Sequence, residues 1–310
     1  MDIHLEQAIY GSQGQGGYQF LARSPDFLEE WLEPAQQLCA GFGDRPPNIT
    51  CPACVFARPF ARNLVAIVQV ADLGTDDTGR PGALGFYLLV LSAKAYQGLG
   101  GDPFWIAEHF PPRWSARGEL AALLWPGEPP PYRPVAAVQH ALKRPEGPSL
   151  LGGAQVLVDG GRLVFERQAP DTALVRDLWT LLPTSTRTHL WPASFAFGND
   201  LGFHVLVVPR VSGEAFARYV TEEQAADYPE GRYELNLQIA AEAGQQGEVD
   251  ALFARRSRAQ TWRLGLILLG AAVLLALFSR LLAPPPKEPA PGRNATQKAP
   301  EHPSTGKEPS

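Results

Sequence analysis

LVAIVQV at residues 64–70 and LGFYLLVL at residues 84–91 are two short runs of almost continuously apolar residues. Each run has the length of a typical strand and is bounded by polar or glycine positions. Strands that do not alternate between apolar and polar residues are typically covered on both faces. The two runs therefore predict central strands of a sheet that is buried on both sides.

The N-terminal segment predicts a β-hairpin. Ile3, Leu5 and Ile9 fall on one face of a strand, and a glycine-rich segment at residues 11–17 leads to a second strand at 18–22. Glycine-rich segments also bind phosphate, but such loops open a helix and either follow the GxGxxG pattern or carry a Lys-Ser/Thr pair. Residues 11–17 precede a strand-like segment and contain no lysine. A hairpin turn is therefore expected there.

Helix starts are predicted at residues 24–26 and at Asp171. Ser24-Pro25-Asp26 combines a capping hydroxyl with proline and an acid, and Asp171 precedes an amphipathic segment that ends at Pro183. We also predict hairpins within 156–166 and 195–208 and a helix from Gly247 onward, whereas 229–243 fits either a strand or a helix. The resulting prediction is an α+β fold with mixed or antiparallel sheets, flanking helices and one C-terminal transmembrane helix.

Shifts in composition divide the chain into six parts. They are an N-terminal α+β subdomain (1–125), a proline-rich connector (126–148), a second α+β subdomain (149–254), a basic juxtamembrane segment (255–263), a transmembrane helix (264–283) and a proline-rich tail (284–310). The tail has no apolar periodicity and is expected to be disordered.

The apolar run LGLILLGAAVLLALF at residues 264–278 contains fifteen residues without a charge. With the next five residues it reaches twenty, and a helix of that length extends ~30 Å, the thickness of a bilayer's hydrocarbon core. The residues expected to form this membrane anchor include Leu264, Leu268, Leu275 and Phe278. Four arginines form the basic edge before it: Arg255, Arg256, Arg258 and Arg263. A lipid bilayer is therefore an expected partner.

Charge is distributed unevenly along the chain. Residues 1–254 hold 18 Lys and Arg against 29 Asp and Glu, a net charge of −11. Such an acidic body disfavours nucleic acid as a partner. The N-terminus lacks the basic and apolar regions of a signal peptide. We therefore expect a single-pass protein of the bacterial cytoplasmic membrane, with its large N-terminal domain in the cytoplasm and its tail outside.

Cys51-Pro-Ala-Cys54 is the one motif with a familiar chemical pattern. A CxxC pair can exchange disulfides or supply half of a zinc site. Cys39 is the only further cysteine, and no histidine stands at ligand spacing, so buried thiols are the expected outcome and redox or metal roles are secondary candidates. The sequence contains no HExxH or GxSxG pattern, and it predicts no catalytic residue, no cofactor and no metal site.

Two stretches carry a resemblance to a known family. Gln7-Ala-Ile-Tyr-Gly11, followed by Gly17-Tyr-Gln-Phe-Leu-Ala-Arg-Ser-Pro-Asp26, resembles the opening of the bacterial GTPase-associated protein 1 family. Leu178-Trp-Thr-Leu-Leu-Pro183, with Arg187 and Ser194-Phe195, resembles a segment found further along such proteins. The resemblance implies an accessory role beside a GTPase, and it implies no catalytic residues.

The hypothesis that combines these features is an adaptor or scaffold that holds a protein partner, possibly a GTPase, at the membrane. Two alternatives stay open. The chain could be an enzyme whose pocket is assembled from residues far apart in the sequence, or an envelope protein that acts through its proline-rich tail.

Overall fold

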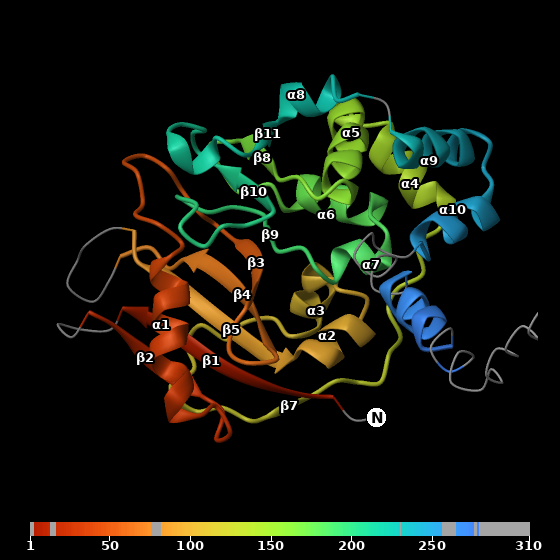
Figure 1. The fold of residues 1–310 in the computed structure, drawn as a ribbon. Helices are drawn as coiled ribbons and strands as arrows, with labels where there is room; N and C mark the ends of the chain where they lie inside the picture. The colour runs from red at the N-terminus through yellow and green to blue at the C-terminus, as the bar shows by residue number, and fades with distance from the viewer. Residues whose placement is uncertain are drawn as a thin grey trace, which may run out of the picture. The chain divides into compact units, whose positions relative to one another are not determined.

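The computed structural model describes residues 3–12, 17–75, 82–229, 231–255, 265–275 and 278. Residues 1–258 form one compact unit, and residues 259–310 form a second. The sheet and the helices α1–α10 described next all belong to the first unit (Figure 1). The predicted tail at 284–310 lies outside the described residues.

Within the described residues, eleven strands form one mixed sheet in the order β11-β8-β10-β9-β3-β4-β5-β1-β2-β6, with β7 paired to β1. The strands β1 to β5 pair antiparallel, whereas β8, β9, β10 and β11 pair parallel, which confirms the predicted mixed sheet with flanking helices. The bounds are β1 (His4–Ser12), β2 (Tyr18–Arg23), β3 (Cys54–Pro59), β4 (Leu64–Asp72), β5 (Leu84–Ser92), β6 (Gly118–Glu119), β7 (Leu123–Leu124), β8 (Leu163–Glu166), β9 (Pro192–Ala193), β10 (Val205–Val208) and β11 (Val220–Thr221).

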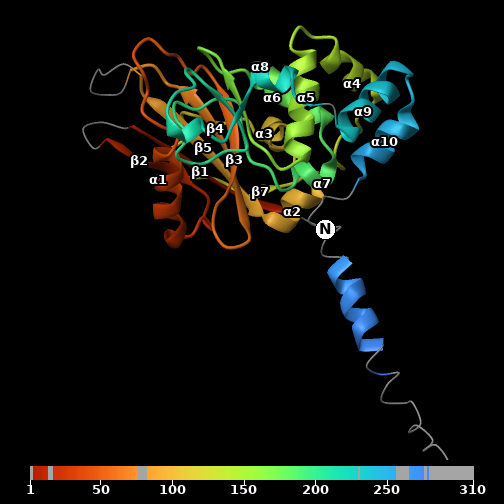
Figure 2. The same cartoon turned by 45° about the horizontal axis from the view of Figure 1, so that its top comes forward.

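The helices gather mostly beside the parallel end of the sheet, where α4, α5, α6, α9 and α10 form one group (Figures 1 and 2). The bounds are α1 (Leu32–Ala40), α2 (Ala93–Gly98), α3 (Pro103–His109), α4 (Val135–Leu142), α5 (Gly147–Val158), α6 (Thr172–Leu181), α7 (Thr184–Arg187), α8 (Glu222–Ala226), α9 (Arg232–Glu242) and α10 (Gln246–Phe253), with short 3-10 helices η2 (Glu29–Trp31) and η3 (Glu214–Phe216).

The two apolar runs form β4 and β5 at the centre of the antiparallel part, as predicted. Successive side chains of a strand point to opposite faces, so the two strands supply two separate cores. Ala66, Val68, Val70, Phe86, Leu88 and Val90 belong to one core, and Val65, Ile67, Tyr87, Leu89 and Leu91 belong to the other. Burial on both faces explains why neither run alternates with polar residues.

The predicted N-terminal hairpin is confirmed, because β1 and β2 pair antiparallel; its turn, at residues 13–16, lies outside the described residues. The helix predicted from residues 24–26 begins later, as η2 followed by α1. The helix predicted from Asp171 is α6. An Asp171 carboxylate oxygen accepts a 2.9 Å hydrogen bond from the Leu174 amide, as expected for a helix-capping residue. The open segment 229–243 contains α9, and α10 follows it.

The hairpin predicted within 156–166 is wrong. Residues 147–158 form α5, and the segment predicted as the first strand is the C-terminal end of this helix. Gly160 adopts a φ of 88°, the Gly160 amide donates to the Leu157 carbonyl, and the Gly161 amide donates to the Val156 carbonyl. This pair of bonds is the Schellman motif that closes a helix with a left-handed glycine. The Asp159-Gly160-Gly161 sequence therefore ends a helix instead of turning a hairpin.

The hairpin predicted within 195–208 is also wrong. The second predicted strand contains β10, but the first, which begins at Phe195, is not a strand. β10 instead pairs in parallel with β9, which ends before Phe195. Between them, residues 196–204 make a loop whose Phe197 amide donates to the Phe42 carbonyl. The loop therefore packs against the end of α1 instead of turning one strand back on the other.

The predicted transmembrane helix at 264–283 is not found. Residues 265–275 and Phe278 are helical and exposed. Among the described residues, no helix is long and apolar enough to cross a membrane. Leu264 and the other remaining positions of the predicted span lie outside the described residues.

The sheet joins the two predicted subdomains, since β3 of the first pairs with β9 of the second. The connector at 126–148 contains α4 and leads into α5. Strand pairing is not the main contact between the halves, however, because β9 has only two residues. A second contact lies where the chain between α2 and α3 meets α6 and α7, and it forms the site described below.

Candidate functional site

Gly101 stands at the corner between α2 and α3 and touches the second half of the chain with its backbone. The Trp179 Nε1 of α6 donates a 2.8 Å hydrogen bond to the Gly101 carbonyl, and the Tyr96 hydroxyl donates to the same oxygen at 3.2 Å. Gly101 has a φ of 64°, and a Cβ at this position would lie 2.8 Å from the Thr188 amide nitrogen. Only glycine combines this backbone conformation with so close an approach.

Asp102 and Arg187 form a salt bridge next to this corner. One Asp102 oxygen accepts bonds from the Phe104 and Trp105 amides at 3.1 Å each and so caps α3, and the other accepts from the Arg187 Nη2. The Arg187 side chain is 6% exposed and that of Asp102 is 16% exposed. The Arg187 Nε is buried and has no hydrogen-bond partner among the described residues. Removing either charge would leave the other one desolvated.

Arg133 of the connector closes the other side of the site. Its guanidinium donates to the Thr180 carbonyl at 3.2 Å, to the Leu182 carbonyl and to the Thr184 hydroxyl at 2.8 Å, so it caps the C-terminal end of α6. Its Cζ lies 3.8 Å from the ring centroid of Phe253 on α10. Burial, and then the nearby Arg187, lowers the pKa of Arg133 to about 9. Arg133 therefore remains charged at neutral pH.

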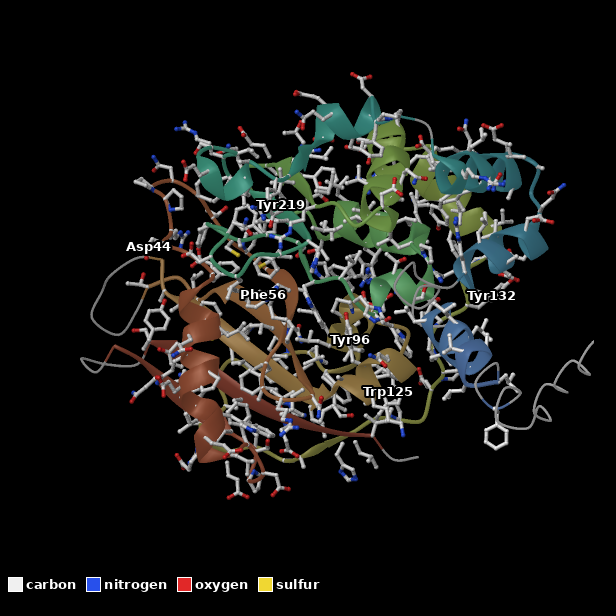
Figure 3. The ribbon with its side chains drawn as sticks, in the orientation of Figure 1. Asp44, Phe56, Tyr96, Trp125, Tyr132 and Tyr219 are labelled. Carbon is white, nitrogen blue, oxygen red and sulfur yellow. The ribbon has the colours of Figure 1, made fainter. Side chains whose placement is uncertain are left out.

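We call these residues the seam: Gly101, Asp102, Arg133, Trp179 and Arg187. A cavity of 430 Å³ is lined by three of them, Asp102, Arg133 and Arg187. Its lining also includes Gln97, Tyr132, Asp250 and Phe253, of which Tyr132 is labelled in Figure 3. The charges of the seam are already used, because Asp102 binds Arg187 and Arg133 binds backbone carbonyls. The arrangement holds two halves of the chain together.

The sequence missed most of the seam. The sequence analysis predicts no role for Asp102 or Arg133. Trp179, Pro183 and Arg187 stand in the segment that resembles the GTPase-associated protein 1 family. Ser194, in the same segment, accepts a 2.9 Å hydrogen bond from the Val55 amide with its hydroxyl. The quoted residues of that segment therefore dock the second half onto the first. Gly101-Asp102-Pro103 combines an acidic capping residue with a following proline, which is typical of a helix start. This pattern is the sequence signal that could have pointed to Asp102.

The secondary candidates Cys51 and Cys54 lie away from the seam, in the core that contains Cys39. Their sulfur atoms are 3.6 Å apart, both residues are buried, and neither forms a disulfide. Burial raises the pKa of Cys54 and of Cys39 well above the ordinary thiol value. A raised pKa suppresses the thiolate that redox exchange and metal binding require. In the described part of the chain, no group of three ligand residues could hold a metal ion.

Burial predicts that these cysteines resist alkylation. Iodoacetamide at pH 8 should leave Cys39 and Cys54 unmodified over an hour in the native chain, because the reagent needs an exposed thiolate. Mass spectrometry of the peptides reports the extent of modification, and the same reaction in urea, where all three thiols should be modified, is the control. Fast modification of Cys54 in the native chain would contradict the buried, protonated thiol.

The juxtamembrane and anchor residues are described only in part. Arg255 ends the described part of the first unit, and its carbonyl accepts a 2.6 Å hydrogen bond from the Ser185 hydroxyl. Arg256, Arg258, Arg263 and Leu264 lie outside the described residues. Leu268, Leu275 and Phe278 are helical and exposed.

The N-terminal part of the chain is similar to a known family. Residues 4–126 match the family model described as GTPase-associated protein 1, N-terminal domain type 2. The predicted resemblance is thereby confirmed for the N-terminal part. No curated protein sequence matches the chain. The segment from Leu178 to Phe195 lies outside the matched residues, so its resemblance stays a prediction.

The end of the matched range separates the residues of the seam. Gly101 and Asp102 lie inside the matched range, and Arg133, Trp179 and Arg187 lie outside it. The second half of the chain therefore contacts the matched residues at Gly101, between α2 and α3, and at Asp102, which caps α3. The domain also contributes β3, whose pairing with β9 extends the sheet into the second half.

Proposed function

We propose that this chain is an adaptor of a bacterial GTPase-linked system, in which the GTPase-associated protein 1 domain binds a protein partner, a GTPase, at the cytoplasmic membrane. The match of residues 4–126 to that family is the observation that carries the proposal. The seam supports a binding role, because Asp102 and Arg187 form a bond between the two halves and Arg133 binds backbone carbonyls of the second half.

A groove on the matched domain is the surface on which we place the partner. It has a volume of 560 Å³ and is lined by residues of β2, β6 and the segment before α1, including Phe20, Leu21, Phe27 and Leu28. Leu28 is 45% exposed. β6 stands last in the strand order, so this groove lies at an edge of the sheet, where backbone groups are available for pairing.

The exposed apolar helix at 265–275 supports the membrane part of the proposal. Leu266, Ile267, Leu268, Leu274 and Leu275 are each more than 60% exposed. A contiguous apolar surface of this kind needs a cover, and lipid is the cover we propose. Holding the adaptor and its partner on one membrane raises their effective concentration without any new contact.

Replacing Leu268 and Leu275 together with arginine tests the role of this helix. Two arginines would place charges on the apolar helix that we propose lipid covers, so the pair should release the chain from the membrane fraction. The GTPase should leave the membrane with it, as fractionation of cells that carry both tagged proteins would show. Replacing the same two residues with alanine is the control and should keep both proteins on the membrane. If the GTPase stays on the membrane after the adaptor is released, recruitment is not the function.

A further inference from the structure

Arg58, Arg162 and His204 lie in one row across the sheet, away from the seam. Arg162 directly precedes β8 and His204 directly precedes β10, and these strands pair in parallel with Val205 opposite Leu163. The ladder continues by one step, because the Leu163 amide donates to the His204 carbonyl at 2.8 Å. Arg58 stands near the end of β3, two residues beyond the pair of Phe56 with Ala193. Residues in the same row of a sheet share a face.

The two guanidinium groups converge on Gly202. The Arg58 Nη1 donates to the Gly202 carbonyl at 3.3 Å, and the Arg162 Nη1 lies 3.8 Å from the place that a Cβ of residue 202 would occupy. Arg58 also lies over the Phe203 ring at 5.9 Å, and Arg162 lies over the Tyr219 ring at 5.7 Å. The Tyr219 hydroxyl, labelled in Figure 3, accepts a 3.5 Å hydrogen bond from the Arg162 Nη1.

Neither arginine has a carboxylate partner among the described residues. By contrast, Arg45, Arg144, Arg167 and Arg187, which are also partly or fully buried, each pair with Asp or Glu. A guanidinium has five N–H donors, and the described contacts use one of them on Arg58 and one on Arg162. Two half-buried cations with unused donors therefore face each other without a counter-charge.

The two arginines also affect the pKa of His204. Its Nδ1 accepts a 3.1 Å hydrogen bond from the Trp191 amide, which leaves Nε2 as its remaining polar atom. Burial, and then Arg162 and Arg58, lowers the pKa of His204 to about 4. Burial and Arg162 also lower the pKa of Arg58. An anion between these groups would offset the repulsion that the fold itself leaves in place.

We propose that Arg58, Arg162 and His204 form a binding site for the phosphate group of a small molecule. A carboxylate has two oxygens and fills one guanidinium fork, whereas a phosphate dianion has the charge and the oxygens for two. The partial exposure of all three residues gives a ligand access, and Phe203 and Tyr219 form an apolar border. The proposal is independent of the adaptor function.

Titration calorimetry of the full chain with orthophosphate at pH 7.5 tests the site. Saturable binding is expected, and Arg58→Gln and Arg162→Gln should each weaken it by about 10- to 100-fold, the value of a hydrogen bond to a charged group. Arg218→Gln removes the same charge from an exposed neighbour of Tyr219 and should not change the affinity. A second arm with guanosine diphosphate distinguishes the sources: tighter binding than orthophosphate assigns the site to a nucleotide, and equal binding assigns it to the phosphate group alone.

Nuclear magnetic resonance of the labelled His204 ring gives a readout that does not depend on affinity. Phosphate should raise the pKa of His204, because it neutralises the two arginines that lower it. Arg162→Gln should raise this pKa without phosphate, which also shows that the variant is folded. An unchanged His204 pKa together with no heat of binding for either ligand in the wild-type chain would overturn the proposal.

Discussion

Replacing Arg187 with alanine should lower the free energy of unfolding of this protein by about 3–5 kcal/mol. The variant leaves the Asp102 carboxylate desolvated without its cation, and it removes a side chain that is only 6% exposed. Urea denaturation at pH 7, followed by tryptophan fluorescence, measures the loss. Trp179 donates to Gly101 within the same seam, so its environment should report the transition.

Arg176→Ala is the matched control for Arg187→Ala. Arg176 also joins α6 to α3, through a salt bridge with Glu108, but its side chain is 41% exposed and that of Glu108 is 57% exposed. An exposed pair typically contributes less than about 1 kcal/mol. If the two variants lose equal stability, the burial of the Asp102–Arg187 pair is not what holds the halves together.

Gly101→Ala should be the second strongly destabilising change, with a loss of about 2–5 kcal/mol. The left-handed backbone of residue 101 costs a residue with a Cβ roughly 1–2 kcal/mol. The new methyl group would also lie 2.8 Å from the Thr188 amide nitrogen, and relieving such a contact costs about 1–3 kcal/mol more. The displacement would strain the bond between Trp179 and the Gly101 carbonyl.

Gly118→Ala separates these two causes. Gly118 has a φ of 80°, but a Cβ at this position would meet no atom within 4 Å. This control should lose only the roughly 1–2 kcal/mol of the backbone conformation. Thermal or urea unfolding of both variants measures the difference, and equal losses would show that the close approach at the seam carries no energy.

The parts of the fold that depend on local pattern were predictable from the sequence. The continuous apolar runs of β4 and β5 indicated strands covered on both faces, and the Asp171 cap located α6. The errors arose where one local pattern fits two structures. Asp159-Gly160-Gly161 can turn a hairpin or close a helix, and the helix is favoured by the packing of α5 against α8, α6 and α9, which the local sequence does not show.

The parts that depend on distant contacts were not predictable. β9 has two residues, and its place in the sheet comes from β3 and β10. The Asp102–Arg187 pair joins positions 85 residues apart, and Arg58 reaches Gly202 across 144 residues. A single sequence does not show which charged residues will meet. Trp179 and Arg187 lie in the segment that resembles the GTPase-associated protein 1 family, but the resemblance implies no role for either residue.

Direct binding to a GTPase tests the central claim most closely. The full chain would be titrated with a purified GTPase from the same cells, loaded with either guanosine diphosphate or a non-hydrolysable triphosphate analogue. We expect saturable binding that Leu28→Glu weakens at least about tenfold, because a charge would replace an exposed leucine in the groove of the matched domain. Leu235→Glu, at an equally exposed leucine on α9 outside the matched range, should bind like the wild type. No binding in either nucleotide state, or equal weakening by both variants, would contradict the adaptor account.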